Sequence, residues 1–265
     1  DSSMRVIVRG GGDLASGTAY KLFQCGFEVI LLECEKPTSI RRYVSFSEAV
    51  YHGQASVENV WCVKAECIQE VEKILSDKKI ALLVDPDGKS ISKLHPDVVV
   101  DAILAKKNLG TRIDMAKIVI GLGPGFEAGK DVHAVVETKR GHSLGVVYYE
   151  GKAIVNTGIP GVIGGYGKER VIHAPETGIL HCKAKIGDIV EKGQCIAMVG
   201  NVCVEASLSG VLRGILPDGF SVWKGLKMAD IDPRKEQVEN CTTISDKARC
   251  IAGGVVEAIL HLHNL

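Results

Sequence analysis

Short apolar runs separated by polar and glycine-rich segments predict alternating strands and helices in the first half of the chain. The runs RVIVR at residues 5–9 and FEVILLE at residues 27–33 are typical of buried strands, and the periodic stretch Leu14 to Phe23 between them is typical of a helix. Further apolar runs occur at residues 60–65, 80–85, 98–102 and 117–121. This alternation predicts an α/β domain with a mostly parallel, helix-covered sheet.

The pattern changes at about residue 168, where short strand-like runs are separated by the turn dipeptides GD, KG, GN, SG and DG. Such spacing predicts a small all-β unit over residues 168–234. The glycine-dense segment 155–167 before it predicts a domain connection that packs against the protein. We therefore expect a Rossmann-like α/β domain at residues 4–167 and a β-domain at residues 168–234.

A helical pattern closes the chain. Apolar residues recur at helical spacing between Ile244 and Ile259, and Ser245 can cap the first turn. We expect residues 235–265 to form a C-terminal helix that packs back on the chain. His261 and His263 suit the end of this helix better than a metal site, and no metal site is predicted.

A glycine-rich turn follows the first strand in the sequence GGGDLASG at residues 10–17. Gly10, Gly12 and Ala15 match the G-x-G-x-x-G/A spacing that lets a backbone approach a pyrophosphate, with the amino terminus of the next helix facing the phosphates. Glu33 follows at about the distance where a carboxylate accepts the ribose hydroxyls. Gly11, Asp13 and Gly17 complete this predicted cofactor loop, although the Asp13 carboxylate beside a phosphate is electrostatically unfavourable. The alternative is a turn that only packs a doubly wound sheet.

Polar residues also follow later strands. Asp85 and Asp87 lie in a DPDG turn, where capping is the commoner role of aspartate. Asp101 ends another apolar run, and the segment after it supplies Lys106, Asn108 and Arg112, which suit an anion. We predict that Asp101, Lys106, Asn108 and Arg112 contribute to the cofactor site.

A second glycine-rich segment follows the strand-like run KIVIG. Gly121, Gly123 and Gly125 precede two predicted paired strands, with Arg140 and His142 in the connecting turn. Successive backbone amides at the end of a parallel strand can form an anion-binding nest, so these five residues join the predicted cofactor site. Plain turn chemistry is the equally good alternative.

Charge and cysteine usage narrow the functional classes. Lys plus Arg and Asp plus Glu number 32 each, so no basic field exists to attract nucleic acid or an anionic membrane. No apolar run approaches the roughly 18 residues that a bilayer span requires. Nine scattered cysteines without a CxxC pair or a secretory leader predict reduced thiols and a cytoplasmic location. Cys182, Cys195 and Cys203 lie in apolar alternation and are expected to be small core residues.

The phrases HAPETGIL, GDIVEKGQCIAMVG, ASLSGVLRG and VWKGLKMADIDP in the β-domain resemble the hammerhead of biotinyl and lipoyl carrier domains. Those carriers present a modifiable lysine on a hairpin tip. The corresponding stretch here, residues 198–206, contains no lysine. The resemblance therefore implies a carrier-like frame that serves structure or docking.

The whole chain from Met4 resembles the YqeB-type accessory proteins of selenium-dependent molybdenum hydroxylase systems. The phrases that carry this resemblance include GGGDLASG, VDAILAKKNLGTRIDMA, GLGPGFEAGKDVHAVVETKRGHSLG and NTGIPGVIGGYGKERVI. It implies kinship with the XdhC family and a role in maturing a molybdenum hydroxylase, whose apoenzyme would be the partner. It implies no catalytic residue, and whether the chain is an enzyme stays open.

Three functions remain open from the sequence. The first is a maturation factor that binds a nucleotide-bearing cofactor, for which molybdopterin dinucleotide and NAD(P) are the candidates. The second is an NAD(P)-dependent oxidoreductase, and the third is a non-catalytic docking scaffold. Homo-oligomerisation is left open as well.

Overall fold

The structure is a computed structural model that describes residues 3–265. The chain forms two compact units, each assembled from segments that are distant in sequence. The first unit comprises the residues up to 37 together with 44–157 and 244–265. The second comprises residues 38–43 and 158–243. Each unit has its own apolar core and is described by itself.

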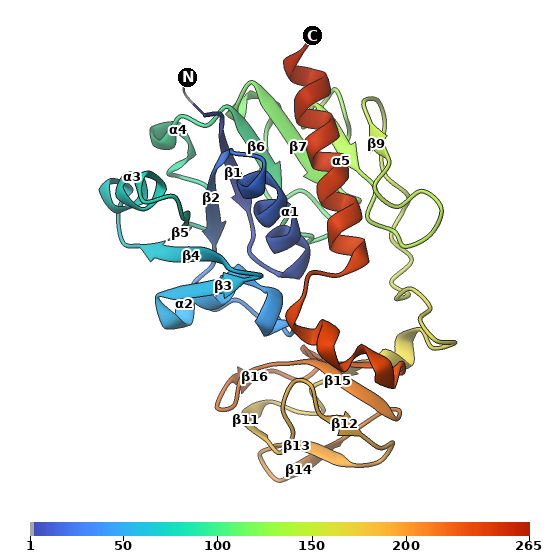
Figure 1. The fold of residues 1–265 in the computed structure, drawn as a ribbon. Helices are drawn as coiled ribbons and strands as arrows, with labels where there is room; N and C mark the ends of the chain where they lie inside the picture. The colour runs from blue at the N-terminus through green and yellow to red at the C-terminus, as the bar shows by residue number, and fades with distance from the viewer. Residues whose placement is uncertain (1–2) are drawn as a thin grey trace. The chain divides into compact units, whose positions relative to one another are not determined.

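The first unit is built on a nine-stranded sheet (Figure 1). Its strands are β1 (Arg5–Arg9), β2 (Glu28–Glu33), β3 (Gln54–Val57), β4 (Val60–Ala65), β5 (Ile80–Val84), β6 (Val98–Asp101), β7 (Ile118–Leu122), β8 (Ala134–Val136) and β9 (Val147–Tyr148). They lie in the order β3-β4-β5-β2-β1-β6-β7-β8-β9. Neighbouring strands are parallel except at the two edges, where β3 is antiparallel to β4 and β9 to β8. The predicted mostly parallel sheet is confirmed.

Five α-helices and three short 3-10 helices belong largely to this unit. They are α1 (Asp13–Gln24), α2 (Ala49–His52), α3 (Ile68–Ser76), α4 (Ile91–Leu94), α5 (Asp246–His263), η1 (Arg42–Val44), η2 (Phe46–Glu48) and η3 (Ile113–Met115). Alternate residues of the central strands supply both sheet faces. Val6 and Val8 of β1 pack in the core that contains α1 and α5, whereas Ile7 packs in the core that contains α3 and α4. The continuous apolar runs are therefore strands buried on both sides.

Helix α5 lies beside α1 on the same face of the sheet (Figure 1). The two helices approach closely because Gly17 has no side chain: a β-carbon there would lie 2.8 Å from the Ala248 Cβ atom. Ser245 caps α5, since its side chain accepts a hydrogen bond from the Ala248 N–H at 3.1 Å. That cap, predicted from the sequence, is confirmed.

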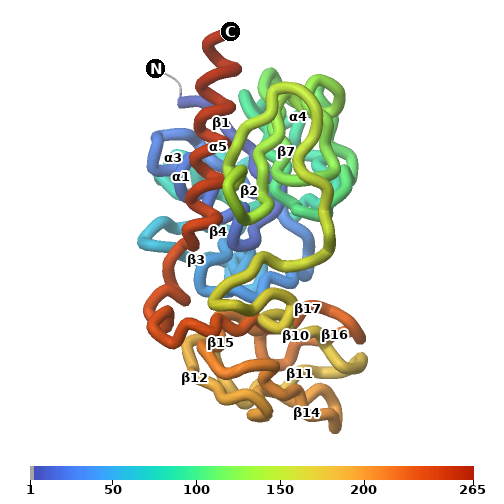
Figure 2. The backbone as a smooth tube through the Cα atoms, turned by 90° about the vertical axis from the view of Figure 1, so that its right-hand side faces the viewer, coloured from blue at the N-terminus to red at the C-terminus, as the bar shows by residue number. Residues whose placement is uncertain are grey.

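The second unit consists of two four-stranded antiparallel sheets, and Figure 2 shows the course of its backbone. One sheet has the order β10-β17-β15-β12 and the other β14-β13-β11-β16. The strands are β10 (Val171–His173), β11 (Gly178–Cys182), β12 (Ile189–Val190), β13 (Cys195–Val199), β14 (Val202–Glu205), β15 (Gly210–Ile215), β16 (Ser221–Val222) and β17 (Lys227–Asp232). Two 3-10 helices, η4 (Lys168–Arg170) and η5 (Lys235–Thr242), flank them in the chain.

Residues 38–43 reach this unit from the first half of the chain. Ile40 is buried in its core, and its carbonyl oxygen accepts a hydrogen bond from the Ile215 N–H at 3.0 Å. Gly214 makes room for this segment, because a β-carbon there would lie 2.9 Å from the Ile40 carbonyl. Arg42 secures it further by donating from Nε to the Ile215 carbonyl at 2.7 Å. A short loop after β2 is therefore part of the all-β core.

Candidate functional site

The carboxyl ends of the parallel strands lie together along one edge of the sheet, here called the carboxyl edge. The direction in which successive strands are added reverses at β1. The chain proceeds from β1 to β2 on one side of β1, then returns to place β6 on its other side. In open α/β sheets, ligands bind outside the carboxyl ends at such a reversal. Between β1 and β6 the backbones are in close contact, since a β-carbon on Gly10 would lie 2.7 Å from the Ala102 carbonyl oxygen. Glycine at this position is a packing requirement.

The glycine turn connects β1 to α1 at this edge. Gly10 has a φ of 110°, a conformation that favours glycine, and Gly12 precedes α1 with no side chain capping the first helical turn. The Gly11 carbonyl accepts hydrogen bonds from the Ser16 hydroxyl at 3.1 Å and the Ser47 N–H at 2.9 Å. The first amides of α1 therefore have no side-chain cap, whereas the Gly11 carbonyl oxygen is engaged by Ser16 and Ser47.

Other residues of the predicted loop have distinct places. Asp13 is the first residue of α1 and is half-buried. Ala15 is buried in the core, and Gly17 contacts α5. Within the sequence GGGDLASG, the helix-packing role therefore falls to Ala15 and Gly17.

Glu33 ends β2 directly beside this turn. A β-carbon on Gly11 would lie 3.1 Å from the Glu33 Oε2 atom, and Glu33 Oε1 accepts a hydrogen bond from the Cys34 N–H at 2.8 Å. Burial raises the pKa of Glu33, an effect that backbone hydrogen bonds from Cys34 and Gly11 only partly offset. Burial likewise raises the pKa of Tyr51 to about 12, and nearby Glu48, Cys34 and Glu33 add to this effect. The α1 side of the edge thus contains the carboxyl groups of Glu33 and Glu48.

The opposite side of the edge, next to α4, holds a charged network around Arg9, a residue that sequence reasoning missed. Arg9 ends β1 with only 2% of its surface exposed, and its Nη1 donates to the Thr111 hydroxyl at 2.8 Å. That hydroxyl donates onward to Asp101 Oδ2 at 2.6 Å, while Arg9 Nη2 donates to the Pro86 carbonyl at 3.0 Å. Asp101 also accepts from the Ile103 N–H at 3.1 Å. The charged ends of the run RVIVR were the signal for such a network, because a buried arginine requires partners.

Asp85 belongs to this side as well. It accepts hydrogen bonds from the Lys89 N–H at 3.0 Å, the Ser90 N–H at 2.8 Å and the Ser90 hydroxyl at 2.5 Å. Burial acts to raise the pKa of Asp85, but these bonds and the charge of Arg9 outweigh it and hold the pKa below its usual value. The turn-capping interpretation of Asp85 is confirmed, whereas Asp87 is exposed.

The segment after β6 is ordered mainly by Asn108. Its side-chain oxygen accepts from the Thr111 N–H at 2.7 Å, and its side-chain nitrogen donates to Asp131 Oδ2 at 3.0 Å. Lys106 is exposed with a positive φ of 64°. Arg112 is exposed and forms an ion pair with Asp114 at 3.1 Å. The amide of Asn108 is engaged in holding the loop, and both cations point to the surface.

The second glycine segment packs against its surroundings. A β-carbon on Gly121 would lie 2.5 Å from the Phe126 ring, and one on Gly123 would lie 2.7 Å from the Thr138 hydroxyl. At Gly125, whose φ is 109°, a β-carbon would lie 2.6 Å from the backbone of Lys107. The structure thus brings Gly125 to the segment that contains Lys106 and Asn108, and each glycine permits a close contact.

Arg140 and His142 are held elsewhere in the first unit. Arg140 Nη1 and Nη2 lie 3.1 and 3.2 Å from the Asp246 carboxylate at the start of α5, and His142 is exposed in the turn. The buried residue of this region is Glu137, which sequence reasoning missed. Its carboxylate accepts from three backbone N–H groups, among them Ile154 at 2.8 Å, and from the Tyr148 hydroxyl at 3.1 Å. Glu137 organises the connecting loops.

An open pocket of about 440 Å³ lies at the carboxyl ends of β4 and β5. Val50, Ala65, Leu83 and Val84 supply its apolar lining, and Glu35, Lys36, Lys64 and Glu66 supply its charged lining. Glu35 and Lys36 lie two and three residues after Glu33 in the chain. A concave site with an apolar lining and a few charged groups suits a small organic molecule.

Two further observations concern metals and membranes. Across residues 3–265, no group of three or more His, Cys, Asp or Glu side chains is arranged to hold a metal ion. Within the same residues, none of the helices has both the length and the apolar character needed to cross a bilayer.

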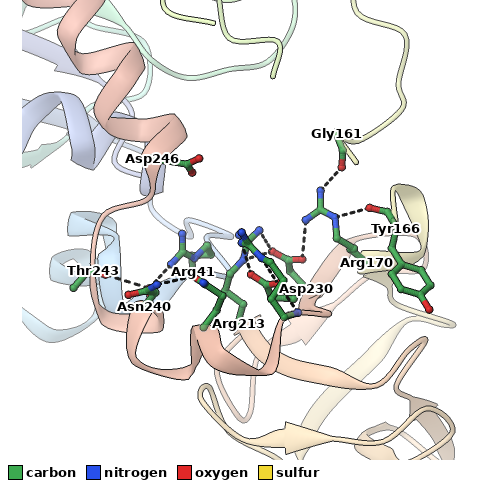
Figure 3. Close-up of polar contacts among 12 residues, drawn as sticks. Arg41, Gly161, Tyr166, Arg170, Arg213, Asp230, Asn240, Thr243 and Asp246 are labelled. Carbon is green, nitrogen blue, oxygen red and sulfur yellow. Dashed lines mark hydrogen bonds and ion pairs between the residues drawn. The ribbon is translucent and has the colours of Figure 1, made fainter. Parts of the chain in front are cut away.

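The second unit contains an arginine-aspartate cluster (Figure 3). Asp230 is buried and pairs with Arg213 and, at 3.7 Å, with Arg170. Arg170 also donates to the Gly161 carbonyl at 2.7 Å and the Tyr166 carbonyl at 3.3 Å. These contacts tie the segment before η4 to the sheet. The cluster therefore explains how a glycine-rich connection becomes ordered.

The cysteine prediction was wrong for Cys203. It is exposed and is joined to Cys195 by a disulfide bond, whereas both were expected to be free core residues. Cys182 is half-buried against the core, closer to the expectation. The apolar alternation predicts a regular strand, but β13 and β14 pair irregularly between Cys195 and Ala197.

These features define a mixed α/β protein with a large, mostly parallel sheet, a polar carboxyl edge and a second, antiparallel β unit. The chain is 51% identical over 257 residues to Uncharacterized protein YqeB from Escherichia coli (strain K12), an alignment that includes 97% of this chain. The chain spans about half the length, 47%, of that relative. No family model matches the chain.

Solved structures resemble the chain only weakly. An aspartoacylase family protein from Mesorhizobium loti has 9% identity and a TM-score of 0.28, and the ectoine utilization protein EutE (DoeB) from Ruegeria pomeroyi has 12% and 0.26. A succinylglutamatedesuccinylase/aspartoacylase from Rhodobacter sphaeroides has 12% and 0.27. Each comparison includes 87% of this chain and 85% of the other. Similarities this low carry no argument about fold or activity.

Proposed function

We propose that the chain is an accessory protein for the maturation of selenium-dependent molybdenum hydroxylases and that it binds a nucleotide-bearing cofactor. The first unit would act as a Rossmann-like binding unit. The observation that carries the nucleotide-binding part of this proposal is the reversal of strand order at β1, directly followed by the glycine turn and the uncapped first turn of α1. A helix amino terminus at that place favours the negative charge of a pyrophosphate.

The neighbouring residues fit the remaining parts of a nucleotide. Glu33 lies beside Gly11, where its carboxylate can accept hydrogen bonds from ribose hydroxyls. The pocket that contains Lys36 and Leu83 begins just beyond Glu33 along the edge and has room for a base. Turn, carboxylate and pocket thus follow one another in the order of phosphate, sugar and base.

The second unit fits a docking role in this proposal. Its paired antiparallel sheets are compatible with the hammerhead resemblance, and the turn between β13 and β14 consists of Gly200 and Asn201. No lysine is present there to carry a biotinyl or lipoyl arm. We propose that this carrier-like unit contacts the hydroxylase apoenzyme.

The first test is native mass spectrometry of the protein isolated from a host that makes molybdenum cofactor and is supplied with selenium. We expect a stoichiometric pterin dinucleotide, identified after acid release. An apo mass that persists after addition of purified cofactor, ATP and NAD(P) would contradict nucleotide binding.

Paired variants then locate the site. Glu33→Gln should weaken binding of the identified nucleotide by about tenfold, since a charged hydrogen bond is worth about 1.5 kcal/mol or more. The control is Glu150→Gln, which makes the same charge change at an exposed position of the same unit. Equal affinities for the two variants by isothermal titration calorimetry would place the ligand elsewhere.

A docking scaffold without a ligand is the second candidate. It is favoured by the contacts of Ser47 and Phe46 on the glycine turn and α1, since the Phe46 N–H donates to the Ser16 hydroxyl at 2.8 Å. Under this alternative the turn is a packing motif. Capture of the apo-hydroxylase by a protein that stays free of nucleotide would support it, and loss of capture on nucleotide removal would oppose it.

A further inference from the structure

The hairpin formed by β13 and β14 has an irregular pairing that changes the direction of one side chain. A two-residue turn, Gly200 and Asn201, joins the strands, and Met198 pairs with Cys203. Ala197 then pairs with Val204, but the next registered pair is Cys195 with Glu205. Two residues of β13 therefore oppose one of β14, which is a β-bulge.

The bulge decides which face Cys195 occupies. Side chains alternate along a regular strand, so Cys195 would share the face of Ala197 and Val199, both of which are fully buried. With the extra residue, Cys195 instead shares the face of Met198 and Cys203. Cys195 and Met198 are half-buried, and Cys203 is exposed. A bulge that re-aims a side chain in this way is a specific structural feature.

Three sulfur atoms meet on this outer face. The Cα atoms of Cys195 and Cys203 are 5.9 Å apart, within the range for a disulfide, and the two cysteines are bonded. The Cys195 Sγ atom also lies 3.8 Å from the Met198 Sδ atom. The disulfide therefore lies on the outer face of the hairpin, with Cys203 exposed and Cys195 half-buried.

We propose that Cys195 and Cys203 form a redox-active pair that exchanges with thiols and disulfides in solution. An incoming thiolate attacks the exposed Cys203 sulfur, the bond between the two cysteines breaks, and Cys195 leaves as a thiolate that takes a proton from water. A second thiolate attacks the substrate sulfur of the mixed disulfide and releases Cys203. In balance, two substrate thiols become one disulfide and the cysteine pair gains two electrons and two protons.

A purely structural link is the less satisfactory explanation. The two cysteines are only eight residues apart, and main-chain pairs on either side of the turn already close the hairpin. A cross-link stabilises less when the loop it closes is short. Exposure of one sulfur also admits an attacking thiolate, which a structural disulfide in a core does not.

The test follows the redox state of these two residues in the folded chain of 265 residues. The protein is equilibrated in buffers with different ratios of reduced to oxidised glutathione, trapped with N-ethylmaleimide and analysed by intact mass and peptide mapping. We expect a single transition in which Cys195 and Cys203 change together from linked to doubly alkylated. A link that survives excess reduced glutathione and also reduced thioredoxin would overturn the proposal, as would two thiols that never form the link in oxidised glutathione.

The two reductants distinguish a small thiol from a protein dithiol as the exchange partner. Reduction by glutathione at a rate comparable to that by thioredoxin indicates small thiols, and reduction by thioredoxin alone indicates a protein dithiol. Either result supports exchange at this pair.

Single-cysteine variants separate the roles of the two residues. Cys195→Ser should leave Cys203 as a stable mixed disulfide with glutathione, because no neighbouring thiol remains to release it. Cys203→Ser should slow adduct formation on this hairpin at least about tenfold, because Cys195 is less accessible. Cys25→Ser, an exposed cysteine of the first unit, should leave the transition unchanged. Equal adduct rates in the first two variants, both folded by circular dichroism, would contradict the assigned order of attack.

Discussion

The two sides of the carboxyl edge are built in different ways. On the side of α4, Arg9 is linked through Thr111 to Asp101, and Asp85 is held by the turn that follows it, so internal partners engage these charges. On the side of α1, the glycine turn and Glu33 lie beside an uncapped helix terminus, and the pocket continues the edge. One side therefore holds the loops in place, and the other has groups available for a ligand.

Removal of Arg9 should have the largest effect on stability. Arg9→Met deletes the buried guanidinium, so that Thr111 loses a hydrogen-bond donor and the buried Asp101 carboxylate is left without a nearby positive charge. We expect the free energy of unfolding to fall by about 3 kcal/mol or more. Urea denaturation monitored by circular dichroism measures it. Arg112→Met, which changes an exposed arginine of the same edge, should alter stability by less than about 0.5 kcal/mol. Similar losses of unfolding free energy for both variants would show that the buried network adds no more stability than an exposed arginine.

The α1 side should instead be sensitive to helix packing. Gly17→Ala places a β-carbon 2.8 Å from the Ala248 Cβ atom, so we expect a loss of about 1 to 3 kcal/mol from overpacking. Gly253→Ala is the matched control, because nothing lies within 4 Å of its β-carbon and alanine favours a helix. That change should stabilise the protein by about 0.5 kcal/mol or more. Thermal unfolding of both variants measures the two stability changes. A stabilising effect of Gly17→Ala would contradict the close approach of α1 and α5.

The smallest effects should appear in the pH dependence of two carboxylates. Asp85 has a lowered pKa, so its stabilising contribution is present above the usual aspartate pKa of 3.8 and is lost as pH falls through the lowered value. Glu33 has a raised pKa, so ionisation destabilises the fold, and stability falls as pH rises from the usual 4.5 through the raised value. Asp85→Asn should therefore be less stable than the wild type at neutral pH, and Glu33→Gln more stable. Urea unfolding from pH 3 to 7 measures both, and differences of the same sign would refute the contrast between the two sides.

Local sequence patterns predicted the parallel sheet, the terminal helix and its Ser245 cap, because these depend on periodicity and on hydrogen bonds between near neighbours. The place of Glu33 beside the glycine turn follows from strand-turn-helix-strand spacing, and the structure brings these residues together. Arg140 and Asn108 were harder to interpret. Their partners, Asp246 and Asp131, lie far along the chain, so no local pattern reveals that these side chains serve to hold loops.

The sequence by itself determined the central strands, the helix after the first strand, the terminal helix and the main turns, since burial of an apolar face and the backbone limits of glycine act over a few residues. Only the tertiary structure decided that Ile40 joins the core of the second unit, that Arg9 reaches Asp101 through Thr111, and that a bulge turns Cys195 toward Cys203. Those outcomes depend on strand register and on contacts between distant segments. The free energy of such contacts arises only when the whole core is assembled, so it leaves no periodic trace in the residues that make them.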